Sequence, residues 1–253
     1  MSLPHLVTFA NYGYLDFVKN FLINLDSVIK NHTLLFYCLD EQILEFVKNY
    51  PYKQLKVIII PWFKGLSTEF ENYHSEKYNI MMRAKTDILT HTLKEYPFIH
   101  FLDCDVGCVK EPTAEYYEQY KGFDMVFQHD YHFVSATQPR NDPHIWGCAG
   151  NFTIRDGKGT QRLLKLWRES EERYPNKNDQ ECLGQLFKDL GSTDYRTLPF
   201  CKLGTYPYVE YTCGSWILYS IGNLNQCYFF HANFVIGSEE KKNLLKKAGL
   251  WFL

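Results

Sequence analysis

Short apolar runs alternate along the first half of the chain with longer stretches in which apolar residues recur every three or four positions. The short runs predict buried strands, because a buried strand usually appears in the sequence as an apolar run of four to eight residues. These strands are expected at 6–10, 34–39, 57–60 and 98–102. The longer stretches have the spacing of helices and are expected at 15–29, 41–49 and 73–95. Strands that alternate with helices predict a mainly parallel sheet flanked by helices, in an α/β fold.

The second half of the chain has a less regular pattern. Strands are expected at 125–127, 151–154 and 227–231, and helices at 159–173, 179–190 and 239–247. We find no internal repeat, no low-complexity tract and no Pro/Gly/Ser-rich linker. A single domain over residues 1–253 is therefore the simplest interpretation.

The strand expected at 98–102 runs directly into Asp103-Cys104-Asp105. In an extended chain, residues i and i+2 project to the same side, so the two carboxylates are expected to converge while Cys104 faces away. Open α/β sheets bind ligands at the carboxyl ends of their strands. Two neighbouring carboxylates are costly without a positive partner, and a hard divalent cation with a phosphate beyond it is the natural one.

Composition narrows the classes of function. The formal net charge is −2, which gives no indication of a nucleic-acid partner. The sequence contains no apolar run of membrane-spanning length, and Met1 to His5 lack the features of a signal peptide, so a cytoplasmic protein is expected. The eight cysteines include no C-x-x-C pair, which argues against a zinc site. Without a signal peptide, buried and reduced thiols are expected rather than disulfides.

Three further segments accompany the Asp-x-Asp sequence. Asn178-Asp179-Gln180 opens an expected helix, where acids and a capping Asn also suit the first turn. His231 is followed by Gly237 and Lys241, and the segment 146–152 is rich in small residues. An α/β half followed by Asp-x-Asp and these segments, in this order, resembles the nucleotide-diphospho-sugar transferases, which are glycosyltransferases of the GT-A fold.

The resemblance implies a nucleotide-binding half at 1–105 and an acceptor and sugar half at 106–253. It implies that Asp103, Asp105 and His231 bind Mn²⁺, with Mg²⁺ as the alternative. A neutral imidazole is a sensible third ligand for manganese. The donor diphosphate is expected beside the metal, and Gly237 and Lys241 are assigned to it. Asp103 and Cys104 are also expected to bind the donor.

The same resemblance implies roles in transfer of the sugar. Asp179 would hold sugar hydroxyls and Gln180 would lie beneath the anomeric carbon, as in enzymes that retain the anomeric configuration. Asp130 belongs to a polar cluster after an expected strand and is assigned to the acceptor side. In an inverting enzyme Asp130 would serve as the base instead.

Residues near the N-terminus are expected to bind the base and ribose of the donor. Thr8, Phe9 and Ala10 end the first strand, and the Tyr12 ring is a candidate to stack on uracil. Lys85 is expected to reach the donor from the helix before the Asp-x-Asp strand, although a solvated helix face is the alternative. The expected donor is a UDP-sugar, with a GDP-sugar as the alternative, and the acceptor is a glycan or another hydroxyl compound.

Two other functions compete with a glycosyltransferase. Haloacid-dehalogenase-like phosphohydrolases also carry Asp-x-Asp after an apolar strand, but there the motif normally lies near the N-terminus. The second alternative is a non-catalytic domain that binds nucleotide sugars. The sequence indicates neither the sugar, the acceptor nor the oligomeric state.

Overall fold

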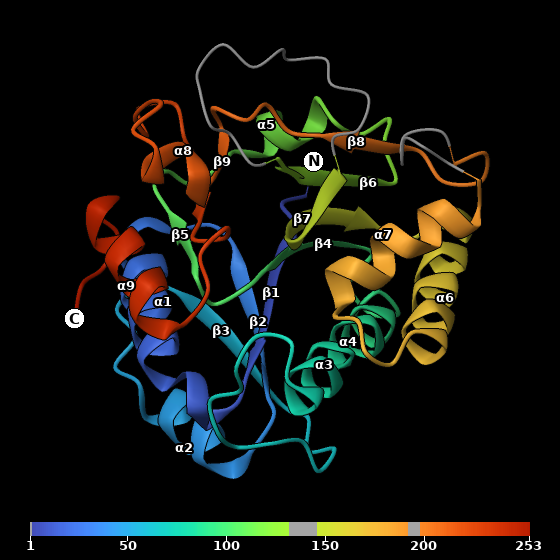
Figure 1. Ribbon diagram of the computed structural model, residues 1–253. Helices are drawn as coiled ribbons and strands as arrows, with labels where there is room; N and C mark the ends of the chain where they lie inside the picture. The colour runs from blue at the N-terminus through green and yellow to red at the C-terminus, as the bar shows by residue number, and fades with distance from the viewer. Residues whose placement is uncertain (1, 132–145, 192–197) are drawn as a thin grey trace.

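The computed structural model describes residues 2–131, 146–191 and 198–253, without the side chain of Trp146. Its main feature is a seven-stranded sheet in the order β3-β2-β1-β4-β7-β6-β8. The strands are β1 (His5–Ala10), β2 (Thr33–Cys38), β3 (Lys56–Pro61), β4 (Phe98–Leu102), β6 (Met125–Asp130), β7 (Trp146–Arg155) and β8 (Leu203–Thr205). This arrangement confirms the predicted single α/β domain with a mainly parallel, mixed sheet (Figure 1).

The first four strands of the sheet are all parallel, because β1 pairs in parallel with both β2 and β4 and β2 pairs in parallel with β3. The chain then reverses at β7, which is antiparallel to both β4 and β6. A smaller sheet, in the order β5-β10-β9, consists of β5 (Val106–Cys108), β9 (Tyr211–Cys213) and β10 (Phe229–His231). Because β5 follows β4 after three residues, the small sheet begins where the central strand of the large sheet ends.

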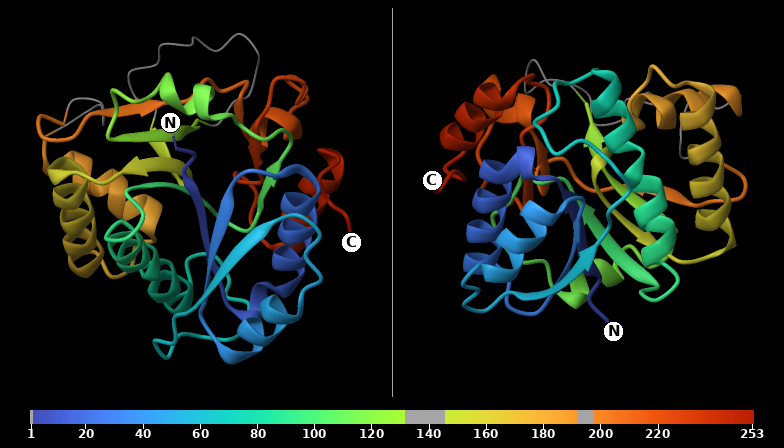
Figure 2. Two further views of the ribbon diagram at one scale, coloured as in Figure 1. Left: turned by 180° about the vertical axis from the view of Figure 1, so that it is seen from behind. Right: turned by 90° about the horizontal axis from the view of Figure 1, so that it is seen from below.

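Helices cover both faces of the large sheet, as the views in Figures 1 and 2 show. One side carries α1 (Leu15–Val28), α2 (Glu41–Asn49) and α9 (Ser238–Lys247). The other carries α3 (Glu76–Met82), α4 (Ala84–Thr92), α6 (Lys158–Arg173) and α7 (Asp179–Asp189). The short helices are η1 (Tyr12–Tyr14), α5 (Ala114–Glu118) and α8 (Gly214–Leu218).

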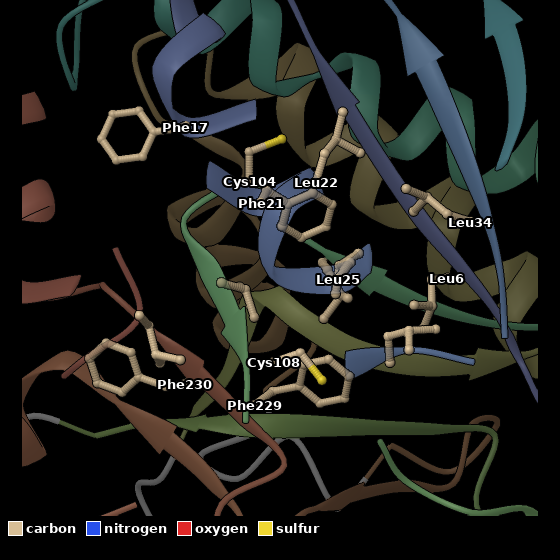
Figure 3. Packing of buried hydrophobic residues seen from close by; sticks show 14 of the residues in the cluster. Leu6, Phe17, Phe21, Leu22, Leu25, Leu34, Cys104, Cys108, Phe229 and Phe230 are labelled. Atoms are coloured by element: carbon tan, nitrogen blue, oxygen red, sulfur yellow. The ribbon is translucent and has the colours of Figure 1, made fainter. Parts of the chain in front are cut away.

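Two buried apolar clusters lie on the two faces of the sheet. Figure 3 shows Phe21, Leu22 and Leu25 of α1 in one buried cluster with Leu6 of β1 and Phe229 of β10. The second cluster joins β1 and β4 to α4, α6 and α7. Burying a side chain of this size contributes about 1.5–3 kcal/mol, so both sheets are held firmly against their helices. All eight cysteines are free and buried.

The sequence prediction of one long helix at 73–95 is wrong, because the structure has two helices, α3 and α4, in this range. Ser75 caps α3 by accepting the N–H of Tyr78, and the helix ends at Met82 before α4 begins. The Arg83 carbonyl accepts hydrogen bonds from the side chains of Thr86 and Arg168, which compete with a continuous helical ladder. None of the helices in the described ranges has both the length and the apolarity needed to cross a membrane.

Candidate functional site

A pocket of about 390 Å³ lies at the carboxyl ends of β1 and β4. Such a volume is within the range of small-ligand sites, and this edge is where α/β sheets bind ligands. Most of the residues assigned from the sequence line it: Phe9, Ala10, Asp103, Cys104, Asp105, Asp130, Asp179, Gln180, His231, Gly237 and Lys241.

The two carboxylates of Asp103 and Asp105 converge as expected, but through a turn rather than an extended strand. The N–H of Val106 donates to the Asp103 carbonyl over 3.0 Å, which closes a four-residue turn. The N–H of Asp103 donates to the Gly150 carbonyl of β7 over 2.8 Å. The turn therefore fixes both acids against β7.

The carboxylates meet the His231 imidazole at the end of β10. One ligand atom from each of Asp103, Asp105 and His231 lies within 4.8 Å of the other two. A Cβ at Gly150 would lie 2.4 Å from His231 Cε1 and 2.5 Å from Asp103 Oδ2, so only glycine leaves this cradle open. Two carboxylates and an imidazole suit a divalent cation such as Mn²⁺, and the residues present therefore fit the metal that the Asp-x-Asp sequence implies.

Lys241 adds a positive charge beside this cluster. Its Nζ contacts Asp105 Oδ2, and His231 Nε2 lies 3.2 Å from Asp105 Oδ1. Burial would raise the pKa of Asp105, but these two cations outweigh burial and lower it. The same Asp105 carboxylate raises the pKa of His231, against the effect of burial. Asp105 is thus held as a carboxylate.

Lys85 lies behind the pocket wall and is fully buried. Its Nζ donates to the Ala149 carbonyl over 2.8 Å and lies 2.5 Å from Asp179 Oδ2 and 3.3 Å from Asp103 Oδ1. Burial would lower the pKa of Lys85, but the two carboxylates raise it. Lys85 therefore links Asp103 to Asp179, and the expected alternative of a solvated helix face is wrong.

The N-terminus of α7 places Asp179 and Gln180 at the pocket. Asn178 caps this helix by accepting the N–H of Glu181, whose side chain bonds back to the Asn178 N–H. The Gln180 amide bridges the backbone of β7: its Oε1 accepts from the Ala149 N–H over 2.6 Å, and its Nε2 donates to the Gly147 carbonyl over 2.9 Å. The sequence motif is therefore both a helix cap and part of the pocket.

Asp130 ends β6 on the wall of the same pocket. Among the residues that the structure describes, no hydrogen bond or ion pair engages its carboxylate. Burial raises the pKa of Asp130 to about 6, and nearby Asp179 acts in the same direction against His231. Asp130 is therefore largely ionised at neutral pH and available to a ligand.

Of the residues assigned near the N-terminus, some line the pocket and others lie outside its lining. Phe9 and Ala10 line the pocket, whereas Thr8 is buried behind it, with its hydroxyl 3.4 Å from the Cys104 thiol. The Tyr12 N–H donates to Asp40, and its ring lies exposed and outside the pocket lining. Tyr14, two residues later, lines the pocket.

Sequence reasoning missed several lining residues. Tyr14 and Phe70 pack together with ring centroids 4.8 Å apart, and Tyr78 comes from α3. Cys148 of β7 touches His231, with Sγ 3.3 Å from Nδ1. The aromatic residues could have been suspected from their nearness to β1 and α3, but nothing local in the sequence indicates the contact of Cys148.

Comparisons with known proteins identify a family and structures of similar fold. A model of the nucleotide-diphospho-sugar transferase family matches residues 30–245. The glycosyltransferase GlyE of Streptococcus pneumoniae TIGR4 is 12% identical with a TM-score of 0.60, over 98% of this chain and 60% of the GlyE chain. The galactosyltransferase LgtC, solved with donor and acceptor sugar analogues, is 14% identical with a TM-score of 0.59, over 98% of this chain and 96% of the LgtC chain.

The chain thus spans 60% of the GlyE chain and nearly all of LgtC. No curated protein matches it. At these identities the two structures show that the fold is shared.

Proposed function

Since the chain belongs to the nucleotide-diphospho-sugar transferase family, we propose that it transfers a hexose or pentose from a UDP-sugar to a hydroxyl of a glycan or similar acceptor. The observation that carries the proposal is the Asp103, Asp105 and His231 cluster, which lies within one pocket with Asp179 and Gln180. The family match favours a transferase over the haloacid-dehalogenase-like phosphohydrolase.

The donor diphosphate belongs beside the Asp-x-Asp turn. Asp103, Asp105 and His231 would hold Mn²⁺, or Mg²⁺ as the alternative, and when bound the metal supplies Lewis-acid stabilisation of the leaving diphosphate. Lys241 and Gly237 are assigned to the same diphosphate, since Lys241 carries a positive charge and both line the pocket. Gly237 is the N-cap residue just before α9 and has φ +96°, a backbone conformation that favours glycine.

The nucleoside is assigned to the half at 1–105. Phe9 and Ala10 contribute the end of β1, and Tyr14 presents its ring to the pocket in place of Tyr12. Thr8 and Cys104 support this wall through their contact. The half at 106–253 supplies the remaining walls for sugar and acceptor.

The sugar is assigned to the N-terminus of α7. Asp179 is held by Lys85 and would accept hydrogen bonds from sugar hydroxyls. Gln180 is fixed to β7 by both ends of its amide, and this supports a positioned, stabilising group beneath the anomeric carbon in a retaining reaction. Asp130, with its available carboxylate, is assigned to the acceptor hydroxyl, and an inverting reaction would use it as the base.

Turnover of a panel of nucleotide sugars with Mn²⁺ tests this function. We expect release of UDP from at least one UDP-hexose or UDP-pentose, and loss of that release in Asp105→Asn but not in Asp156→Asn, an exposed acid at the end of β7. Release of phosphate from simple phosphoesters would instead support the phosphohydrolase. Donor binding without turnover over a wide acceptor panel would favour a non-catalytic domain.

A further inference from the structure

The far side of the His231 imidazole contacts a thiol. Nε2 faces Asp105, with 3.2 Å between Nε2 and Oδ1, and Nδ1 lies 3.3 Å from Cys148 Sγ. Within residues 2–131, 146–191 and 198–253, these two side chains are the hydrogen-bonding partners of the imidazole. Cys148 is 3% exposed and belongs to β7, so the contact joins the large sheet to the small one.

The surroundings of the sulfur indicate that it accepts hydrogen bonds. The Gly150 N–H donates to Cys148 Sγ over 3.4 Å. Asn233 approaches with its Nδ2 at 4.0 Å, and its amide orientation is fixed because Oδ1 accepts the N–H of Gly214 over 2.7 Å. Cys148 Sγ therefore lies among N–H donors, which is where an acceptor for a protonated Nδ1 belongs.

A histidine that binds a metal through one nitrogen is usually oriented by an acceptor on the other. That acceptor holds the proton on the distal nitrogen and leaves the proximal lone pair for the metal. In most such sites the acceptor is a carboxylate or a carbonyl oxygen. A carboxylate here would add a third negative charge to those of Asp103 and Asp105, whereas a thiol accepts without adding charge.

We infer that Cys148 is a positioning residue that holds His231, through an Nδ1–H···Sγ hydrogen bond, with Nε2 turned toward the metal held by Asp103 and Asp105. The inference rests on the metal site of the proposed function. It assigns to the thiol neither contact with the metal nor a part in the transfer itself.

The test measures Mn²⁺ affinity in the presence of UDP, from the electron paramagnetic resonance signal of free Mn²⁺. We expect Cys148→Ala to weaken Mn²⁺ binding by about 10-fold or more, as removal of such outer partners does. Cys148→Ser keeps an acceptor on the same Cβ and is expected to recover most of that loss. Cys38→Ala is the matched control, because Cys38 is equally buried but lies in β2, outside the pocket lining.

The outcomes separate this inference from the proposed function. Unchanged Mn²⁺ affinity in Cys148→Ala, with tight binding by the wild type, would overturn the role of Cys148 and leave the metal site standing. Equal losses of Mn²⁺ affinity in Cys148→Ala, Cys148→Ser and Cys38→Ala would mean that general packing causes the loss. That result would also overturn the role of Cys148. If Cys148→Ala does not fold, Cys148→Ser decides, since a loss as large as that of His231→Ala would contradict the inference. A wild type that binds no Mn²⁺ with UDP would overturn the metal site, and the inference with it.

Discussion

At the scale of single residues, the site depends on a few close contacts. One ligand atom from each of Asp103, Asp105 and His231 lies within 4.8 Å of the other two, and Gly150 leaves the space beside them open. Asp103, Asp105 and His231 could be assigned because their residue types and order match a known pattern, and the structure brings all three together. Tyr14 could not be separated from Tyr12, because the short turn η1 decides which ring faces the pocket. The contact between Cys148 and His231 joins residues from two sheets, so no local pattern reports it.

Gly150→Ala is expected to weaken metal binding while leaving the fold intact. The new Cβ would lie 2.4 Å from His231 Cε1 and 2.5 Å from Asp103 Oδ2, so the ligands must move apart. We expect the Mn²⁺ affinity measured with UDP to fall at least ~10-fold, comparable to the loss of an outer-sphere partner. Gly184→Ala is the control, because its Cβ meets nothing within 4 Å in α7 and should stabilise the protein by roughly 0.5–1 kcal/mol. Equal Mn²⁺ affinity in the wild type and Gly150→Ala would contradict the claim that only glycine at this position leaves the metal site open.

Gln180→Ala is expected to lower kcat much more than it raises KM for the donor. The amide is held against β7 at both ends, so its proposed role is stabilisation of the transition state rather than ground-state binding. Gln185→Ala, on the same helix, serves as the control, since Gln185 bonds to Asp189 outside the pocket. If Gln180→Ala raises KM for the donor and leaves kcat unchanged, Gln180 is a simple binding contact.

At the scale of elements, the long strands and helices follow from periodicity, and the exceptions have physical causes. The strands β5, β8 and β9 are three residues each, too short to show a period of two. At the break between α3 and α4, Arg168 donates to the Arg83 carbonyl from a distant helix. Such a tertiary contact cannot be read from the local apolar pattern.

The packing of α6 on α4 buries a carboxyl group, and this predicts a pH dependence of stability. Glu171 is fully buried, accepts the Thr86 hydroxyl over 2.8 Å, and has its pKa raised by burial from 4.5 to about 8. Because the folded pKa exceeds the unfolded one, the folded state binds the proton more tightly. The contribution of Glu171 to the free energy of unfolding is therefore most favourable below about pH 4.5 and falls as the pH rises toward 8.

Glu171→Gln is expected to remove the contribution of Glu171 to the fall in the free energy of unfolding as the pH rises. Each pKa unit corresponds to ~1.4 kcal/mol, so the wild type should lose up to a few kcal/mol more than the variant between pH 5 and pH 8. Urea unfolding at the two pH values measures the difference. Glu172→Gln changes the exposed neighbour and should leave the dependence as in the wild type. An identical pH dependence in wild type and Glu171→Gln would refute the argument.

At the scale of the whole molecule, the topology explains why one pocket collects residues from both halves. The parallel strands β1 and β4 end at the same edge, and β7 runs back beside β4 to present Cys148, Ala149 and Gly150 there. The sequence predicts the parallel part, since strands and helices alternate. Within β7 (Trp146–Arg155) it predicts a strand only at 151–154, because the small residues at 147–150 lack the apolar signature of a strand.

The central claim is that this pocket binds a nucleoside diphosphate through a metal. The most direct test is the melting temperature of the protein with a panel of nucleoside diphosphates, with and without Mn²⁺, beside Asp105→Ala. A ligand at ~100 times its Kd stabilises by about 2.7 kcal/mol, which raises the melting temperature of a chain of this size by roughly 5–10 °C. We predict a shift with UDP and Mn²⁺ together that is absent without Mn²⁺ and in Asp105→Ala. An equal shift in Asp105→Ala, or none with any nucleotide, would contradict the account.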